Sequence, residues 1–138
     1  MVSDPIADFL TRIRNACMLR KQCVQTPLSK ASRRLAQIFK ERGFVKGYEL
    51  DTSGRYAQLV VQLKYDDKNC SVIEGLRRVS RPGHRVYCDA QNLPKVQGGM
   101  GIAVISSSRS LADGKGGMIT DTQARKLGVG GEVICKVW

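Results

Sequence analysis

The chain lacks the paired titratable residues on which most enzymes depend. Its single histidine, His84, follows a Pro-Gly pair with no carboxylate at an obvious spacing, and no cysteine has a recognisable activating partner. Acid–base and nucleophilic catalysis near neutral pH both need such partners. We therefore predict that the chain is not an enzyme, that it has no small-molecule substrate, and that His84 lies on the surface.

Long apolar runs are also missing. A helix that crosses a bilayer needs about 20 consecutive apolar residues, and no segment approaches that length. Asp4-Pro5 already has the pattern of a helix start, and no targeting segment is expected ahead of it. The sequence therefore predicts a protein that does not cross a membrane.

The five cysteines are an odd number, without a C-x-x-C pair or a regular spacing. A disulfide framework and a zinc knuckle both require such spacing. We expect free and mostly buried thiols in a reducing compartment, with no metal and no cofactor. The residues concerned are Cys17, Cys23, Cys70, Cys88 and Cys135.

Basic residues are abundant, with 23 Lys and Arg against 12 Asp and Glu and a net charge of +11. The first 50 residues carry 10 basic and 4 acidic side chains, so the excess is spread over the whole chain. Such an excess repels itself unless a polyanion compensates it. RNA, DNA or an acidic membrane surface are the candidate partners, and lysines that only aid solubility are the alternative.

Two glycine clusters resemble nucleotide-binding loops but have the wrong spacing. Gly99-Met100-Gly101 is followed by Val104 where a dinucleotide motif has its third glycine, and residues 114–117 lack the P-loop spacing. Mononucleotide binding is therefore disfavoured. We predict instead that residues 98–101 form a tight turn into a strand.

Helical spacing dominates the first 43 residues. Asp4-Pro5 predicts a helix start, because Asp caps free amides and Pro has no amide to lose there. A second helix is expected from Ser29 to a left-handed cap at Gly43. The apolar residues expected on the buried faces are Ile6, Phe9, Leu10, Ile13 and Cys17, then Ala31, Leu35, Ile38 and Phe39.

A hairpin should follow, with strands at 44–50 and 55–65 around a turn at 51–54. Residues 66–69 indicate another turn, and the irregular apolar spacing at 72–79 leaves helix and strand both open. The second hairpin strand is expected to bury alternate residues, namely Ala57, Leu59, Val61, Leu63 and Tyr65.

Turn chemistry and short apolar runs characterise the second half. Arg81-Pro82-Gly83-His84 predicts a type II turn, with a strand at 85–89 after it. Residues 101–106 are typical of a strand buried on both faces, and residues 107–117 indicate an exposed loop. Thr120 and Gln123 predict a capping box and a short helix that ends at Gly128, before a last strand at 133–138.

The densest basic cluster lies at residues 77–85, and Tyr87 follows it. Arginines that fork to phosphates, with an aromatic ring that stacks on a base or ribose, are typical of RNA-binding surfaces. Ser106-Ser107-Ser108 and Arg125 add hydroxyls and charge that can contact riboses and phosphates. A solvated charge run is the alternative. We expect the second half to carry the main RNA surface.

Several short motifs occur in a fixed order: Asp4-Pro5-Ile6-Ala7-Asp8, Leu10-Thr11-Arg12-Ile13-Arg14-Asn15-Ala16, Arg78-Val79-Ser80-Arg81-Pro82-Gly83, Leu93-Pro94-Lys95-Val96, Gly99-Met100-Gly101-Ile102-Ala103-Val104, Thr120-Asp121, Ala124-Arg125 and Gly130-Gly131-Glu132. In order and spacing the chain resembles the eighth protein of the small ribosomal subunit, a universal family, in its bacterial or organellar form. The resemblance runs from end to end.

The resemblance implies an α+β protein of two small domains. A helix-strand-helix-hairpin α/β unit would occupy residues 1–68, and a mainly β unit with a short helix residues 69–138. The implied function is that of a structural constituent of the small subunit, which binds the central domain of small-subunit ribosomal RNA, promotes its assembly and supports translation beside neighbouring ribosomal proteins. The implied RNA contacts are Thr11, Arg14, Asn15, Lys30, Arg78, Ser80, Arg81, Pro82, Gly83, Tyr87, Ser106, Ser107, Ser108, Thr120, Arg125 and Glu132.

Two further roles stay open: repression of its own messenger RNA, as in some bacterial relatives, and membership of an RNA-modifying enzyme. The resemblance implies a bacterial-type ribosome, inside a plastid in preference to a mitochondrion, with the bacterial cytoplasm as the alternative. Two departures from the family pattern are Ser107, in place of a threonine, and a longer connection at residues 109–117.

Overall fold

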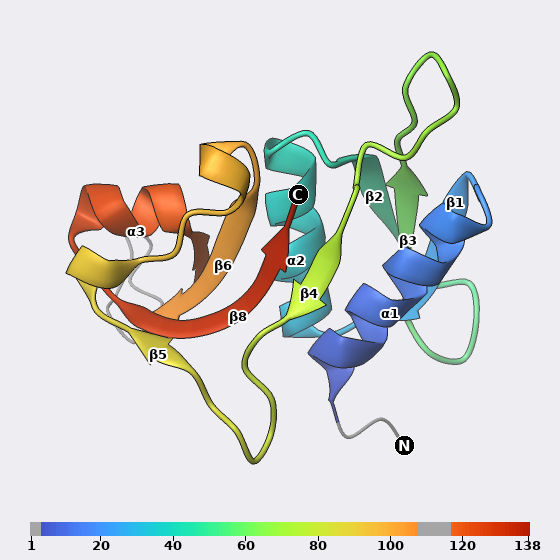
Figure 1. The fold of residues 1–138 in the computed structure, drawn as a ribbon. Coiled ribbons are helices and arrows are strands. Elements are labelled where there is room, and N and C mark those ends of the chain that lie inside the picture. The colour runs from blue at the N-terminus through green and yellow to red at the C-terminus, as the bar shows by residue number, and fades with distance from the viewer. Residues whose placement is uncertain (1–3, 108–116) are drawn as a thin grey trace. The chain divides into compact units, whose positions relative to one another are not determined.

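The computed structural model describes residues 4–107 and 117–138 (Figure 1). The chain divides into two compact units, the N-terminal unit up to Glu74 and the C-terminal unit Gly75–Trp138. This division falls six residues after the boundary expected at 68, and the assignment of domains stays a prediction. Three helices and two antiparallel sheets confirm the α+β class.

The N-terminal unit has two helices and a three-stranded antiparallel sheet with the order β1-β3-β2. A strand lies between the helices, as expected, and its position is now defined. The elements are α1 Pro5–Met18, β1 Cys23–Pro27, α2 Lys30–Glu41, β2 Val45–Asp51 and β3 Gln58–Leu63.

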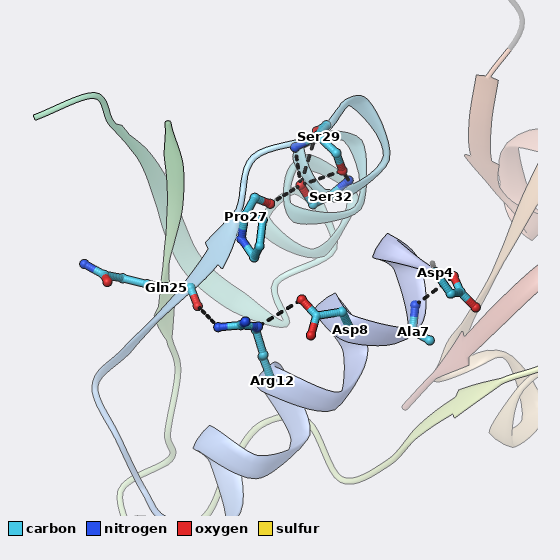
Figure 2. Close-up of polar contacts among 8 residues, drawn as sticks. All are labelled: Asp4, Ala7, Asp8, Arg12, Gln25, Pro27, Ser29 and Ser32. Carbon is cyan, nitrogen blue, oxygen red and sulfur yellow. Dashed lines mark hydrogen bonds and ion pairs between the residues drawn. The ribbon is translucent and has the colours of Figure 1, made fainter. Parts of the chain in front are cut away.

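Both helices of this unit begin where capping chemistry predicts. The Asp4 side chain accepts a hydrogen bond from the Ala7 amide at 3.2 Å, with Pro5 in the first turn of α1. Ser29 and Ser32 exchange side-chain and backbone bonds at 2.9 and 3.0 Å, which forms a capping box at the start of α2 (Figure 2). Side chains thus satisfy amides that a helix start leaves unpaired. The cap expected at Gly43 is confirmed by its φ of +79°.

The buried faces largely follow the predicted periodicities, with five exceptions. In β3 alternate residues Leu59, Val61 and Leu63 are buried, as expected. Ala57 precedes the strand and is exposed, and Tyr65 follows it and is half-buried, so the predicted strand at 55–65 was too long. Ile6 and Cys17 of α1, and Ala31 in the first turn of α2, are only half-buried.

The C-terminal unit is built on a sheet with the order β4-β8-β6-β7, with β5 also paired to β8. Helix α3 packs beside β6 and β7, over a core formed by Val96, Ala103, Ile105, Ile119, Ala124, Val129 and Val133. The elements are β4 Leu76–Arg78, β5 Tyr87–Cys88, 3₁₀ turns Ala90–Asn92 and Gln97–Gly99, β6 Ile102–Ser107, β7 Gly117–Thr120, α3 Asp121–Leu127 and β8 Gly131–Val137.

Several expectations for this unit are confirmed. Residues 102–105 are fully buried, in agreement with a strand covered on both faces. Thr120 and Gln123 form the predicted capping box, and Gly128 ends α3 with a φ of +67°. Residues 97–99 form a turn into β6 in which Gly98 and Gly99 have positive φ.

Other boundaries were wrong. The strand expected at 85–89 is only two residues long, and the last strand begins at Gly131 rather than at residue 133. Ser107 was expected in an exposed loop, but it ends β6 and is buried. The rest of that loop expectation, up to residue 116, lies outside the described residues.

Gly130 and Gly131 sit where two backbones approach closely. A Cβ at Gly130 would lie 2.3 Å from the Cys88 carbonyl oxygen, and one at Gly131 would lie 2.3 Å from the Ser106 carbonyl oxygen. Real Cβ atoms do not approach backbone oxygens so closely. These two glycines let β8 begin between β5 and β6.

The cysteines correct one expectation. All five are free, but Cys23 and Cys70 are exposed, and only Cys135 is fully buried. Burial raises the pKa of the Cys135 thiol to about 12. Since the thiolate is the reactive form, this thiol should be inert in the folded protein.

We therefore expect Cys23 and Cys70 to react first with an aromatic disulfide reagent at neutral pH. Cys135 should react only when denaturant unfolds the C-terminal unit. Mass spectrometry of peptides after timed labelling would measure the order. Labelling of Cys135 at the rate of Cys23 in the folded protein would contradict the structure.

Candidate nucleic-acid interface

A basic turn leaves the sheet between β4 and β5, where the chain extends as an open loop (Figure 1). Arg81 and His84 exchange backbone hydrogen bonds of 3.0 and 2.9 Å, and Gly83 has a φ of +86° after Pro82. These features agree with the predicted type II turn. All four residues are exposed, including His84, as expected. We call residues 81–84 the arginine turn.

The base of the arginine turn is held by Glu132, the second residue of β8. Its Oε2 atom accepts hydrogen bonds from Ser80 Oγ at 2.6 Å and from Arg85 Nη1 at 3.1 Å. Ser80 is fully buried, and its hydroxyl also accepts a bond from the Val86 amide at 3.3 Å. One carboxylate therefore ties both ends of the loop to the sheet. We call the bonds of Glu132 to Ser80 and Arg85 the Glu132 clasp.

Four residues form a row across the sheet next to this clasp. Tyr87 of β5 pairs with Glu132, Glu132 with Ser106 of β6, and Ser106 with Met118 of β7. Directly paired residues of an antiparallel sheet point to the same face. Tyr87 is 71% exposed, so its ring is free to stack on a planar partner. The row therefore places an aromatic ring, a carboxylate and a hydroxyl side by side.

Thr120 and Arg125 have structural contacts within this unit. Thr120 is buried, and its hydroxyl accepts the Gln123 amide. Arg125 donates to the buried carboxylate of Asp121 at 2.8 Å and to the Pro94 carbonyl at 2.8 Å. Asp121 in turn accepts the Ala103 amide. Thr120 therefore caps α3. Arg125 and Asp121 together hold α3 against β6 and against the segment that precedes β6.

The arrangement offers binding groups rather than reactive ones. Within residues 4–107 and 117–138, no group of three or more His, Cys, Asp or Glu side chains could hold a metal ion. None of the described helices has the length and apolar character needed to cross a membrane. Arginines, an exposed aromatic ring and hydroxyls are the groups that contact phosphates, bases and riboses.

A family model described as "Ribosomal protein S8" matches residues 4–138. The chain belongs to the ribosomal protein S8 family. The match takes in every element of both units, and the sequence expectation of this family is confirmed.

Curated relatives agree along their whole length. The small ribosomal subunit protein uS8 of Caldicellulosiruptor bescii is 49% identical over 137 residues, which covers 99% of this chain and 98% of the relative. The uS8 proteins of the cyanobacteria Rippkaea orientalis and Synechococcus sp. are 47% and 49% identical, with 98% and 97% of the relative covered. The chain is therefore of the bacterial type of this family.

The uS8 protein of Finegoldia magna is 45% identical over 138 residues, with 100% of both chains covered. The longer connection expected at residues 109–117 stays a prediction, and all of it except Gly117 lies outside the described residues.

Among the implied contacts of this S8-family chain, the structure brings together Ser80, the arginine turn, Tyr87, Glu132 and Ser106. Ser107 is buried at the end of β6, and Ser108 lies outside the described residues. Arg78 is half-buried in β4, with Nη1 3.4 Å from the Ile134 carbonyl oxygen. The implied contacts did not include Arg85, although it belongs to the predicted basic cluster and shares the Glu132 carboxylate.

The implied contacts of the N-terminal unit lie on helices. Thr11, Arg14 and Asn15 are exposed on α1 at positions i, i+3 and i+4, which form one face of a helix. Lys30 is exposed in the first turn of α2. Each unit therefore presents its own polar surface.

Proposed function

We propose that this chain binds small-subunit ribosomal RNA directly, within its central domain, and promotes assembly of the small subunit. Membership of the S8 family supports a structural role in that subunit. The observation that carries the proposal is the Glu132 clasp, which fixes a basic turn beside an exposed aromatic ring and a serine. Neighbouring small-subunit proteins would be the other partners.

The chemistry of this surface divides into two parts. Arg81 and Arg85 can fork to phosphate oxygens, which supplies affinity without sequence information. Tyr87 can stack on a base or ribose, and the Ser106 hydroxyl can pair with a 2′-hydroxyl. Tyr87 and Ser106 would therefore recognise the RNA by its shape and by its 2′-hydroxyl, which DNA lacks.

We also propose that the ribosome lies inside an organelle, with a plastid favoured. The Gly98-Gly99-Met100-Gly101 segment and the Cys-x-Val-Trp ending support this, because they resemble plastid and cyanobacterial members. Recovery of the chain from ribosomes of isolated plastids would support the proposal. Recovery only from a bacterial cytoplasm would overturn it.

Arg81→Ala tests the phosphate contact. If Arg81 meets one phosphate, the slope of log affinity against log salt concentration should fall by about one unit or less. The measurement is a salt titration of binding to labelled small-subunit RNA, with the RNA analysed for covalent change in the same samples. A covalent product would favour the RNA-modifying alternative.

Lys68→Ala is the matched control, since it removes one exposed positive charge from a turn of the N-terminal unit. The slope for Lys68→Ala should lie closer to that of the unsubstituted chain than the slope for Arg81→Ala does. Equal slopes for Arg81→Ala and the unsubstituted chain would remove Arg81 from the phosphate contacts.

A further inference from the structure

Helix α2 carries positive charge that its own unit does not neutralise. Its 12 residues include four basic side chains and a single acidic one. In α1, by contrast, Arg12 is paired with Asp8 at 2.9 Å. Within the described part of the chain, none of Lys30, Arg33 and Lys40 has a carboxylate partner. Ion pairs inside the unit therefore do not account for these three charges.

The three charges share one face of α2. Lys30, Arg33 and Lys40 are all exposed, whereas Leu35 and Phe39 are buried on the opposite face. Steps of three and seven residues return to nearly the same side of a helix with about 3.6 residues per turn. At a rise of about 1.5 Å per residue, Lys30 and Lys40 are about 15 Å apart along the axis. We call these three basic residues the α2 stripe.

Both ends of the α2 stripe are held by contacts within the unit. The capping box of Ser29 and Ser32, with bonds of 2.9 and 3.0 Å, fixes the first turn of the helix (Figure 2). Lys30 lies in that turn. Near the other end, Lys40 Nζ lies 5.8 Å from the centre of the Tyr48 ring of β2, which is a cation–π contact. A preformed surface loses little conformational freedom on binding.

The single acidic residue of α2 does not neutralise the α2 stripe. Glu41 ends the helix, and its Oε1 atom accepts a hydrogen bond from the Gln37 amide at 3.3 Å. The carboxylate is therefore engaged by a neutral side chain. The face keeps an excess of positive charge along its length.

We propose that the α2 stripe binds the phosphate backbone of RNA, as a second contact of this chain. Lys and Arg neutralise phosphates, and the counterions that the RNA releases add to the affinity. Such contacts carry no sequence information, so the stripe supplies affinity and orientation rather than selection of a base. Among its residues only Lys30 was an implied RNA contact, and Arg33 and Lys40 extend that contact along the helix.

The arrangement favours RNA over an acidic protein segment. A nucleic-acid strand carries one charge per nucleotide at regular intervals, which suits a row of three cations over about 15 Å. The first 50 residues carry 10 basic and 4 acidic side chains, so the field around the stripe attracts a polyanion. The inference rests on the proposed RNA-binding function and adds a contact in the N-terminal unit.

A triple variant with Lys30→Ala, Arg33→Ala and Lys40→Ala tests the stripe in a salt titration. If the stripe meets three phosphates, the slope of log affinity against log salt concentration should fall by about two to three units. Affinity at low salt should fall about tenfold or more, by the same factor for small-subunit RNA and for an unrelated RNA duplex. Alanine is a strong helix former, so the thermal midpoint should change little.

The matched control removes the same charge from other elements of the same unit. Lys46→Ala, Lys64→Ala and Lys68→Ala change three exposed lysines outside α2. This second triple variant should lower the slope by less than about one unit. Equal falls for the two triple variants would mean that only the net charge matters, and would overturn the stripe.

Acetylation of amines locates the contact directly. Lys30 and Lys40 should be protected in the complex with small-subunit RNA, whereas Lys68 should stay reactive, as measured by mass spectrometry of peptides. Stripe lysines that react equally in the complex and in the free chain would overturn the proposal. Protection only in assembled subunits, and not in the RNA complex, would assign the stripe to a protein partner and overturn it as well.

The unrelated RNA duplex separates this inference from the proposed function. If the chain shows no preference for small-subunit RNA but the stripe variant weakens binding to both RNAs, the proposed function is wrong and the stripe is upheld. If the chain prefers small-subunit RNA and the stripe variant binds as the unsubstituted chain does, the stripe alone is wrong.

Discussion

Gly131→Ala should destabilise the C-terminal unit by about 3 kcal/mol, the upper part of the range for overpacked sites. The added Cβ would lie 2.3 Å from the Ser106 carbonyl oxygen and 3.2 Å from the Ile105 side chain. The clash is with backbone, so no rotamer change relieves it, and β8 would have to move away from β6. Urea unfolding followed by circular dichroism, with a fit of the unfolding free energy, measures the effect.

Gly117→Ala is the control in the same sheet. Gly117 begins β7, and a Cβ there would have no heavy atom of a described residue within 4 Å. The substitution should be neutral or slightly stabilising, because alanine restricts the unfolded chain more than glycine does. Similar losses for the two variants would show that the close approach at Gly131 is not the cause.

Local chemistry explains why the helix starts could be predicted. Asp4, Ser29 and Thr120 cap amides within three residues of themselves, so the signal for each helix start is contained in a short window. The turn at 81–84 is equally local, since Pro82 and Gly83 set its dihedrals. These features depend little on the rest of the fold.

Strand boundaries were harder because they depend on distant partners. In β1 only Thr26 is buried, so no alternation of apolar residues marked its position before Pro27. The two residues of β5 form a strand because they pair with Glu132 and Gly131, more than 40 residues away. Ser107 belongs to β6 because it pairs with Gly117 of β7. None of these contacts is visible in a local window of sequence.

The candidate site shows the same division. The basic cluster and Tyr87 could be recognised from composition, because arginines and an exposed aromatic ring have a known use in RNA binding. The bond between Ser80 and Glu132 spans 52 residues and could not be recognised in this way. The role of Glu132 is therefore clearer from the structure, since a carboxylate repels phosphates but can position the groups that bind them.

Glu132→Ala should lower the affinity for small-subunit RNA about thirtyfold, although it removes a negative charge. Without Oε2, Ser80 and Arg85 lose their common acceptor, and only backbone bonds still tie the ends of the loop to β8. Hydrogen bonds to a charged group contribute about 1.5–3 kcal/mol, which corresponds to this loss if the turn must be ordered again on binding. Filter binding to labelled RNA measures the affinity.

Glu132→Gln distinguishes positioning from charge. Its amide oxygen can still accept the Ser80 hydroxyl, so its affinity should remain within about threefold of the unsubstituted chain. Hydrogen exchange at the Val86 amide, which donates to Ser80 Oγ, should become faster in Glu132→Ala and change little in Glu132→Gln. A gain in RNA affinity in Glu132→Ala would mean that the carboxylate only repels phosphates. Because the exchange rate is measured without RNA, it reports on the clasp even if the affected surface binds a different partner.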